Sequence, residues 1–348
     1  MSFLTDAEKQ MLSISRMIFH VVGKSLEEPI LLEEIEPPQF TDFFLERVKS
    51  ALKGNLFEFK LHSPTEATLR SIGENENNFS NSTKALARDF QRLHSGGNTS
   101  EGVFFVFELM AGQDNTIYAL IKYDNEDVVR YILNQNGTEI VPQLERFRET
   151  FVRKAEAMQK IALVRLQDDQ GGKVIVKDRS KPTHISDYFQ SFLEVRRVNS
   201  PEKMSSKLVD AFKNTFKKHR TSLPIEIQRS GVSHIYAVLR QNGQQFDAEN
   251  YEPLISAIFG AVDENSPIRN TLSKNLKDLG IAEESFEIIP ESIQKPPRRR
   301  LETVEGTQVI YDEEHAPERI PHEDGVRTKI VIVTTEITTD DIDIGKGS

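Results

Sequence analysis

The sequence predicts a mixed α+β protein, in which helices combine with antiparallel sheet and hairpins. Three observations indicate this class. Apolar and polar residues alternate in short runs such as NLFEFKLH (55–62), which is typical of a strand with one polar face. Pairs of β-rich runs are separated by turn-forming segments such as AGQDN (111–115), which predicts hairpins. Other segments repeat apolar residues every three or four positions, which predicts helices.

The first half of the chain contains both kinds of pattern in alternation. Its apolar runs are short and are bounded by Gly, Pro, Asn and Asp. The elements expected here are a strand over 13–22, a helix over 40–52, a strand over 55–62, a helix over 80–94, a hairpin of 102–110 with 116–123, a helix over 144–160, a hairpin of 160–167 with 173–178, and a helix over 185–195.

The second half begins with helices and ends with strands. The elements expected here are a helix over 200–220, a linker over 221–230, a helix from Asp247 to Gly260, a helix from Ser266 to Gly280, and strands within 295–304, 305–312 and 329–337. We therefore expect an N-terminal α+β domain over 1–220, a domain over 221–335 that is first helical and then β-rich, and a disordered tail over 336–348.

Composition limits the classes of protein that fit. The chain has 348 residues, enough for about two domains that each bury a core. It contains no Cys, which excludes disulfides, cysteine nucleophiles and thiolate metal sites, and which fits a reducing compartment. The N-terminal residues lack the pattern of a signal peptide, and no apolar run approaches about 20 residues. We expect a cytoplasmic protein with no membrane partner.

The most informative segment is SPEKMSSKLVDAFKNTFKKHR (200–220), a basic helix in an acidic chain. Between residues 196 and 220 there are eight Lys and Arg against two acids, whereas the whole chain has a net charge of −10. A local surplus against the global charge indicates a surface with an anionic partner, of which nucleic acid is the first candidate. The alternative is an ordinary solvated helix face. The candidate DNA-binding residues of this segment are Arg196, Arg197, Lys203, Lys207, Lys213, Lys217, Lys218 and Arg220.

Two further basic clusters are candidates for contact with phosphates. Three cations follow one another at intervals of four residues along the helix expected over 80–94, and three consecutive Arg follow Pro296–Pro297. Such residues contact the DNA backbone without reading bases. The additional candidates are Lys84, Arg88, Arg92, Arg298, Arg299 and Arg300.

Motifs for catalysis are missing from the sequence. It contains no G-x-S-x-G, no Walker A segment, no G-x-G-x-x-G and no H-E-x-x-H. One pattern of metal-dependent nucleases is present, since Glu58 and Lys60 share a strand face and Asp42 precedes them. The alternative is a strand whose polar residues simply face solvent. We expect no enzyme activity, no metal and no cofactor, and the nuclease stays a remote alternative.

Seven blocks of the chain resemble, in their order and spacing, the bacterial nucleoid-associated protein family often called NdpA. The resemblance covers most of the chain, and its middle third is the most specific part. The blocks are ISRMIFHVVG (14–23), FSNSTKALARDFQRL (79–93), SEGVFFVFELMAGQDNTIYALIKYDNED (100–127), AEAMQKIALVRL (155–166), VKDRSKPTHISDYFQSFLEV (176–195), NLKDLGIAEESFEI (275–288) and RRRLETVEGTQVIYD (298–312).

This resemblance implies a protein of the cytoplasm and the nucleoid that binds double-stranded DNA with little sequence preference. In some members it also implies an association with a type II topoisomerase. The candidate residues above follow from charge and not from the resemblance. A second class stays open, in which the protein is an accessory subunit of a topoisomerase or of a phage-defence complex and the basic helix docks on an acidic protein. A homodimer is the candidate assembly.

Overall fold

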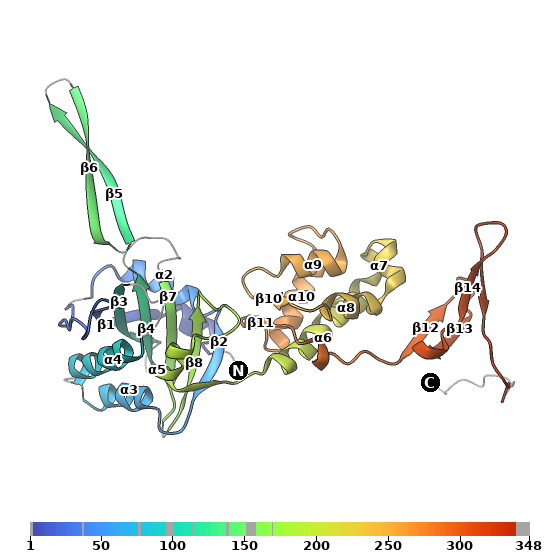
Figure 1. Ribbon diagram of the computed structural model, residues 1–348, viewed down its shortest axis with the longest axis horizontal. Coiled ribbons are helices and arrows are strands. Elements are labelled where there is room, and N and C mark those ends of the chain that lie inside the picture. The colour runs from blue at the N-terminus through green and yellow to red at the C-terminus, as the bar shows by residue number, and fades with distance from the viewer. Residues whose placement is uncertain are drawn as a thin grey trace. The chain divides into compact units, whose positions relative to one another are not determined.

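The computed structural model describes residues 3–338, except 37, 76–77, 95–100, 113–114, 125, 137–138, 151–157 and 169. Contacts divide the chain into two units, Met1–Ile293 and Gln294–Ser348. Helices combine with antiparallel strands in the first unit, and hairpins make up the second, so the predicted α+β class is confirmed (Figure 1).

A seven-stranded antiparallel sheet organises the first part of unit 1. Its order is β1-β3-β4-β7-β8-β2-β9, so β1 and β9 are its edge strands. The strands are β1 (Leu12–Val22), β2 (Asn55–Phe59), β3 (Gly102–Ala111), β4 (Thr116–Asp124), β7 (Met158–Leu166), β8 (Gly172–Asp178) and β9 (Val195–Arg197).

Alternation along these strands builds a core on each face of the sheet. On β3, Phe104 belongs to one core and Phe105 to the other, as a strand with side chains on alternate faces requires. The first core is completed by α3 (Pro64–Glu74), α4 (Phe79–His94) and α5 (Asp187–Leu193). The second core is completed by α2 (Thr41–Ser50) and the residues that precede α1 (Asp6–Gln10).

A third core lies in the helical part of unit 1, which follows β9. Its long helix is α6 (Pro201–His219), and its buried apolar residues run from Met204 to Ile293. The remaining elements are η3 (Arg220–Ser222), α7 (Ile225–Ser230), α8 (Val232–Leu239), β10 (Gln245–Phe246), α9 (Glu252–Phe259), α10 (Pro267–Asp278), β11 (Phe286–Glu287) and η4 (Pro290–Ser292). The helix thus shares its core with the residues that follow it. The domain ranges predicted above concern independent folding and stay predictions.

The helix predicted over 144–160 is wrong. Residues Glu139–Thr150 form strand β6, which pairs with β5 (Glu126–Asn136) in a separate two-stranded sheet, and Met158 already belongs to β7. Residues 151–157 lie outside the described residues. The apolar spacing fits a helix, but ten paired positions with β5 override that local preference.

The linker predicted over 221–230 is also wrong, because it contains η3 and α7, and Leu223 is buried in the third core. Asp247 does not cap a helix. Its carboxylate accepts the N–H of Glu249 two residues later, and α9 begins at Glu252. The sequence therefore predicted a helix in this region correctly but placed its start too early.

Unit 2 consists of two hairpins within the residues that the structure describes. Strand β12 (Arg298–Glu302) pairs with β13 (Gln308–Asp312), and β14 (Glu318–Pro321) pairs with β15 (Thr328–Val331). A short turn, η5 (Glu313–His315), lies between them. The strands predicted within 295–304 and 305–312 are confirmed. The strand predicted within 329–337 is confirmed only at its start, and β14 lies outside the predicted strands. The predicted tail falls outside the described residues from position 339 onward.

Candidate nucleic-acid interface

Helix α6 forms where the sequence predicts it, and for the expected reasons. The Ser200 side chain accepts the backbone N–H of Lys203 at 3.4 Å, and Pro201 occupies the first turn. The inner face is fully buried, so the phase of the helix is fixed by its core. The predicted apolar stripe is confirmed in the buried residues Met204, Leu208, Phe212 and Phe216.

The outer face of α6 carries cations that no carboxylate neutralises within the described residues. Lys203, Lys217, Lys218 and Arg220 are exposed and Lys207 is half-buried, and none of them forms an ion pair there. We call Lys203, Lys207, Lys217 and Lys218 the α6 lysines. Side chains of this kind are available to an external anion without first losing an internal partner.

Lys213 differs from the α6 lysines because it has partners of its own. Its Nζ lies 3.1 Å from the Asp210 carboxylate. Partial burial lowers the pKa of Lys213, but hydrogen bonds to Asp210 and Tyr236 outweigh burial and raise it overall. Asp210, the acid that interrupts the basic face in sequence, is therefore neutralised from within the helix.

Arg196 and Arg197 precede α6 on strand β9 and lie in different surroundings. Arg196 is exposed, and its Nε donates to Glu58 on the paired strand β2 at 2.7 Å. Arg197 is almost enclosed, with 14% of its side chain exposed. Burial lowers the pKa of its guanidinium, and the Glu284 carboxylate opposes that shift. Arg197 therefore faces the interior of unit 1.

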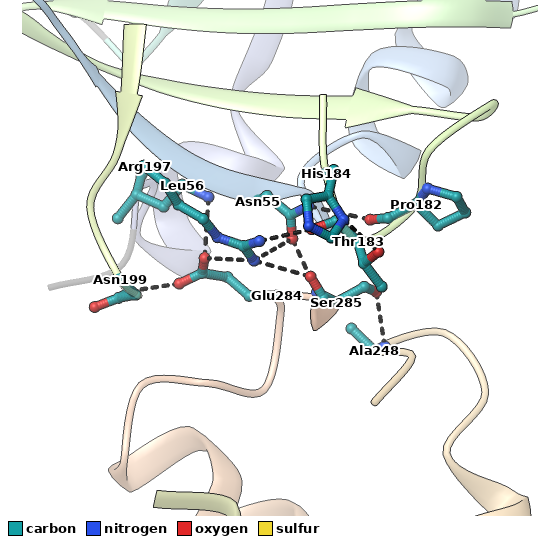
Figure 2. Close-up of polar contacts among 10 residues, drawn as sticks. All are labelled: Asn55, Leu56, Pro182, Thr183, His184, Arg197, Asn199, Ala248, Glu284 and Ser285. Atoms are coloured by element: carbon teal, nitrogen blue, oxygen red, sulfur yellow. Dashed lines mark hydrogen bonds and ion pairs between the residues drawn. The ribbon is translucent and has the colours of Figure 1, made fainter. Parts of the chain in front are cut away.

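Arg197 lies at the centre of a polar network between the sheet and the helical part (Figure 2). Its Nη1 donates to the Thr183 carbonyl at 2.6 Å, and its Nη2 donates to Asn55 Oδ1 at 3.0 Å and to the Ser285 carbonyl at 2.9 Å. The Glu284 carboxylate lies 3.5 Å from the same nitrogen. These bonds hold the chain immediately before α6 in one position.

Asn55 and Glu284 extend this network on either side of Arg197 (Figure 2). Asn55 Oδ1 also accepts the Ser285 N–H at 3.0 Å, and Glu284 accepts the Leu56 N–H at 3.3 Å and a short hydrogen bond from Asn199. These bonds satisfy most polar atoms of the buried pair, which lowers the cost of burying its charges, although Arg197 Nε has no partner within the described residues. The network positions α6 and leaves 14% of the Arg197 side chain exposed, so Arg197 has little surface to offer to DNA.

The cations of α4 are largely neutralised. Lys84 Nζ lies 2.6 Å from Glu33, whose carboxylate also accepts the Ser80 hydroxyl at 3.0 Å. These two bonds lower the pKa of Glu33. Arg92 pairs with Asp89 at 3.2 Å, whereas Arg88 is exposed and has no ion pair within the described residues.

The three Arg of β12 lie in unit 2 and are each close to an acid. Arg298 lies 3.7 Å from Asp312 on the paired strand, and Arg299 lies 3.5 Å from Glu313. Arg300 lies 2.8 Å from Glu302. Surface pairs of this kind contribute little stability, yet they reduce the net positive charge of the hairpin.

The nuclease pattern finds no support in the geometry. Glu58 is bonded to Arg196, Lys60 is exposed beyond the end of β2, and Asp42 is exposed in the first turn of α2. Among the residues that the structure describes, no group of three His, Asp or Glu side chains could hold a metal ion. What the arrangement offers chemically is a cationic surface.

Sequence reasoning did not single out two cations that lie on α10, next to α6. Lys274 and Lys277 are exposed and have no ion pair within the described part of the chain. They lie opposite the buried stripe of Ile268, Leu272 and Leu276, so helical periodicity could have found them. Their proximity to α6 depends on packing between helices that are about fifty residues apart.

Comparison with known proteins gives one finding. The family model described as "Nucleoid-associated protein YejK" matches residues 18–333. No curated protein matches the chain. In the described residues, no helix is both long enough and apolar enough to cross a membrane.

Proposed function

Because the chain belongs to the nucleoid-associated protein YejK family, we propose that it binds double-stranded DNA of the nucleoid with little sequence preference, in an architectural or regulatory role. The family is not a known enzyme family, which agrees with a binding function. The observation that supports the proposal is the outer face of α6, where the α6 lysines have no acidic partner in the described residues.

The physical argument concerns what these lysines can recognise. An ammonium group binds a phosphate oxygen as a point charge, and it carries no information about the base beside it. Binding through such contacts releases counterions from the duplex, so it weakens steeply with salt. We therefore expect affinity for duplexes of any sequence and a strong dependence on ionic strength.

The acidic net charge of −10 does not oppose this function. At physiological salt, charges separated by more than about 8 Å are largely screened. A phosphate at the outer face of α6 therefore responds mainly to the nearby lysines. Because the inner face of the helix is buried and the chain before it is fixed by Arg197, those lysines act together from one rigid element.

The test is a reversal of charge at the four α6 lysines. The variant K203E/K207E/K217E/K218E should fold normally, since these side chains point away from the core. Fluorescence anisotropy with a random-sequence duplex should show a large loss of affinity and a log–log salt slope less steep by up to about 3.6. The matched control K24E/K49E/K53E/K60E has the same net charge, with exposed lysines of the sheet part changed instead.

Wild-type affinity in the α6 variant, with an unchanged thermal melt, would remove this helix as the DNA site. An equal loss in both variants would show that net charge alone governs binding. The same duplex incubated with Mg²⁺ or Mn²⁺ should stay intact, and Glu58→Gln should leave binding unchanged.

A protein partner is a second candidate, and one observation in unit 2 favours it. Large apolar side chains are almost fully exposed there, with Val304 at 99%, Val326 at 89% and Val333 at 88%. Apolar side chains that gather into one exposed patch are typical of surfaces that bind another protein, whereas scattered ones are ordinary, so replacement of all three valines tests whether they act together. If that partner is a type II topoisomerase, the two should co-elute in gel filtration, and V304S/V326S/V333S should abolish co-elution while duplex binding persists.

A further inference from the structure

Helix α10 packs beside α6 in antiparallel orientation. Near the C-terminal end of α6, His219 Nε2 lies 2.8 Å from the Thr271 hydroxyl. One turn further along α10, Asn275 Nδ2 donates to Thr215 Oγ1 at 2.9 Å and to the Ala211 carbonyl at 3.4 Å. These bonds fix the register of the two helices, because they join three turns of one to two turns of the other.

The outer face of α10 is basic. Its inner face is buried, and Lys274 and Lys277 lie opposite that face, exposed and without an ion pair in the described residues. The third cation of the helix, Arg269, is occupied by Glu252, with one contact of 2.6 Å and a second short one. The free charge of α10 therefore comes from the two lysines.

The register places Lys274 next to the α6 lysines. On α6, residues 211, 215 and 219 mark the line that touches α10. Lys207 lies one turn before Ala211 on that same line, and Lys218 lies on the next line outward, at 100° per residue. On α10, residues 271 and 275 mark the line that touches α6, and Lys274 lies on the next line outward. Because 219 lies opposite 271, Lys218 and Lys274 flank the same stretch of the interface.

We propose that Lys274 and Lys277 belong to the same DNA site as the α6 lysines, so that α6 and α10 form one two-helix surface for the phosphates of a duplex. This inference rests on the proposed function. The α6 lysines span about 22 Å along their helix, at about 1.5 Å per residue. Packed helices have axes about 8–10 Å apart, so α10 adds a second, parallel row of cations.

Two rows of cations favour a duplex over a single strand. The minor groove of B-DNA is about 6 Å wide and is lined by a phosphate row on each side. Cations carried by two helices whose axes lie about 8–10 Å apart can therefore reach phosphates of both strands across that groove, whereas a single strand offers one row of phosphates. Asp278 ends the outer face of α10, so we place the contact of this helix at Lys274 and Lys277.

The test neutralises the two α10 lysines in the full-length protein. For K274Q/K277Q we expect a duplex salt slope less steep by about 1.8 than wild type, since each lost phosphate contact removes about 0.9. Affinity for a single strand of the same length should change less than affinity for the duplex. The control K49Q/K53Q carries the same change in net charge on exposed lysines of the sheet part.

The outcomes separate this inference from the proposed function. If K274Q/K277Q keeps the wild-type duplex slope while the α6 charge-reversal variant loses binding, α6 acts alone and the two-helix site is wrong. If K49Q/K53Q loses as much affinity as K274Q/K277Q, net charge accounts for the effect and the site is again wrong. If the wild-type protein does not bind the duplex at all, the proposed function itself fails. If the α6 charge-reversal variant binds like wild type, the DNA site lies elsewhere and the two-helix site is wrong.

Discussion

Helices α4 and α6 are both basic in sequence, but they differ in what their cations touch. On α4, Lys84 is held by Glu33 and Arg92 by Asp89. On α6, four lysines have no acidic partner within the described residues. The comparison shows that a row of Lys and Arg predicts a charged surface, whereas its availability to DNA depends on the acids that the fold brings to it.

The acid that neutralises Lys84 of α4 comes from an extended segment along the edge of the sheet. Ile30 exchanges two backbone hydrogen bonds with Val21 on β1, both of 3.0 Å. Three residues later, Glu33 reaches Lys84, which is 51 residues away in sequence. Glu33 of this acidic segment is thus neutralised by a cation of α4.

The largest effect that we expect tests whether both helices are anchored in the same way. Phe216 on α6 is 4% exposed, and Phe90 on α4 is fully buried and stacks on Phe104 with ring centroids 4.6 Å apart. Truncation of either phenylalanine to Ala should lower the free energy of unfolding by about 3–5 kcal/mol. Urea denaturation measures it. If Phe216→Ala unfolds like wild type, the outer face of α6 is assigned wrongly.

A second prediction concerns His20, a buried histidine near α4. We expect it to make the stability of the sheet part depend on pH. His20 is fully buried on β1, where its Nδ1 accepts the Leu32 N–H at 3.2 Å. Burial first, and then the charge of Lys84, lowers the pKa of His20 to about 4, from 6.5. The unfolded chain therefore binds a proton more readily than the folded one between these values.

Protonation of His20 therefore favours the unfolded chain, so acid should destabilise the sheet part. The stability contributed by neutral His20 is complete above pH 6.5 and is lost as the pH falls towards about 4, by about 3 kcal/mol in total. Urea denaturation between these pH values should show the loss, and His20→Gln should remove most of it. A variant whose stability keeps the wild-type pH dependence would assign the loss to another group.

Much of the fold could be predicted from the sequence because it is encoded locally. The alternation around Phe104 and Phe105 gives a strand between two cores, and Ser200–Pro201 gives the start of α6. The elements that differ from the prediction do so for different reasons, since α3 carries a local start signal at Ser63–Pro64 whereas others depend on distant partners. Strand β6 is specified by its pairing with β5, and α7 follows a Pro that marks the start of a helix as well as a linker.

For the candidate site, too, the features encoded locally in the sequence could be predicted. The phase of α6 identified its lysines, since the buried stripe is visible in sequence. The role of Arg197 was not visible, because its partners Glu284 and Ser285 are 87 and 88 residues away, in the helical part of unit 1. The position of Lys274 beside α6 was not visible either, because it is set by the register between α10 and α6. Charge can be read locally, and so can pairs within one helix such as Arg92 with Asp89, but pairs between distant segments cannot.

A third prediction compares the two helices directly by neutralising three cations on each. K207Q/K217Q/K218Q should make the duplex salt slope less steep by about 2.7, because three unpaired charges are removed. K84Q/R88Q/R92Q should change it by at most about 0.9, since Arg88 is the cation of that group without an ion pair in the described residues. Anisotropy titrations at about 50 and about 200 mM salt measure both. Equal slopes would mean that internal ion pairs do not protect α4.

The smallest effect comes from releasing one cation of α4. Glu33→Gln removes the carboxylate that holds Lys84, and it leaves Ser80 a neutral acceptor. Lys84 then becomes available to phosphate, so duplex affinity at low salt should rise slightly and the salt slope should steepen by up to about 0.9. The gain in affinity is limited because only 20% of the Lys84 side chain is exposed.

The variant E33Q/K84Q should return to the wild-type slope, since the released cation is then absent. A fall in affinity for Glu33→Gln alone would show that Glu33 supports the DNA-binding form of the protein, and that the difference between α4 and α6 does not arise from masking of Lys84.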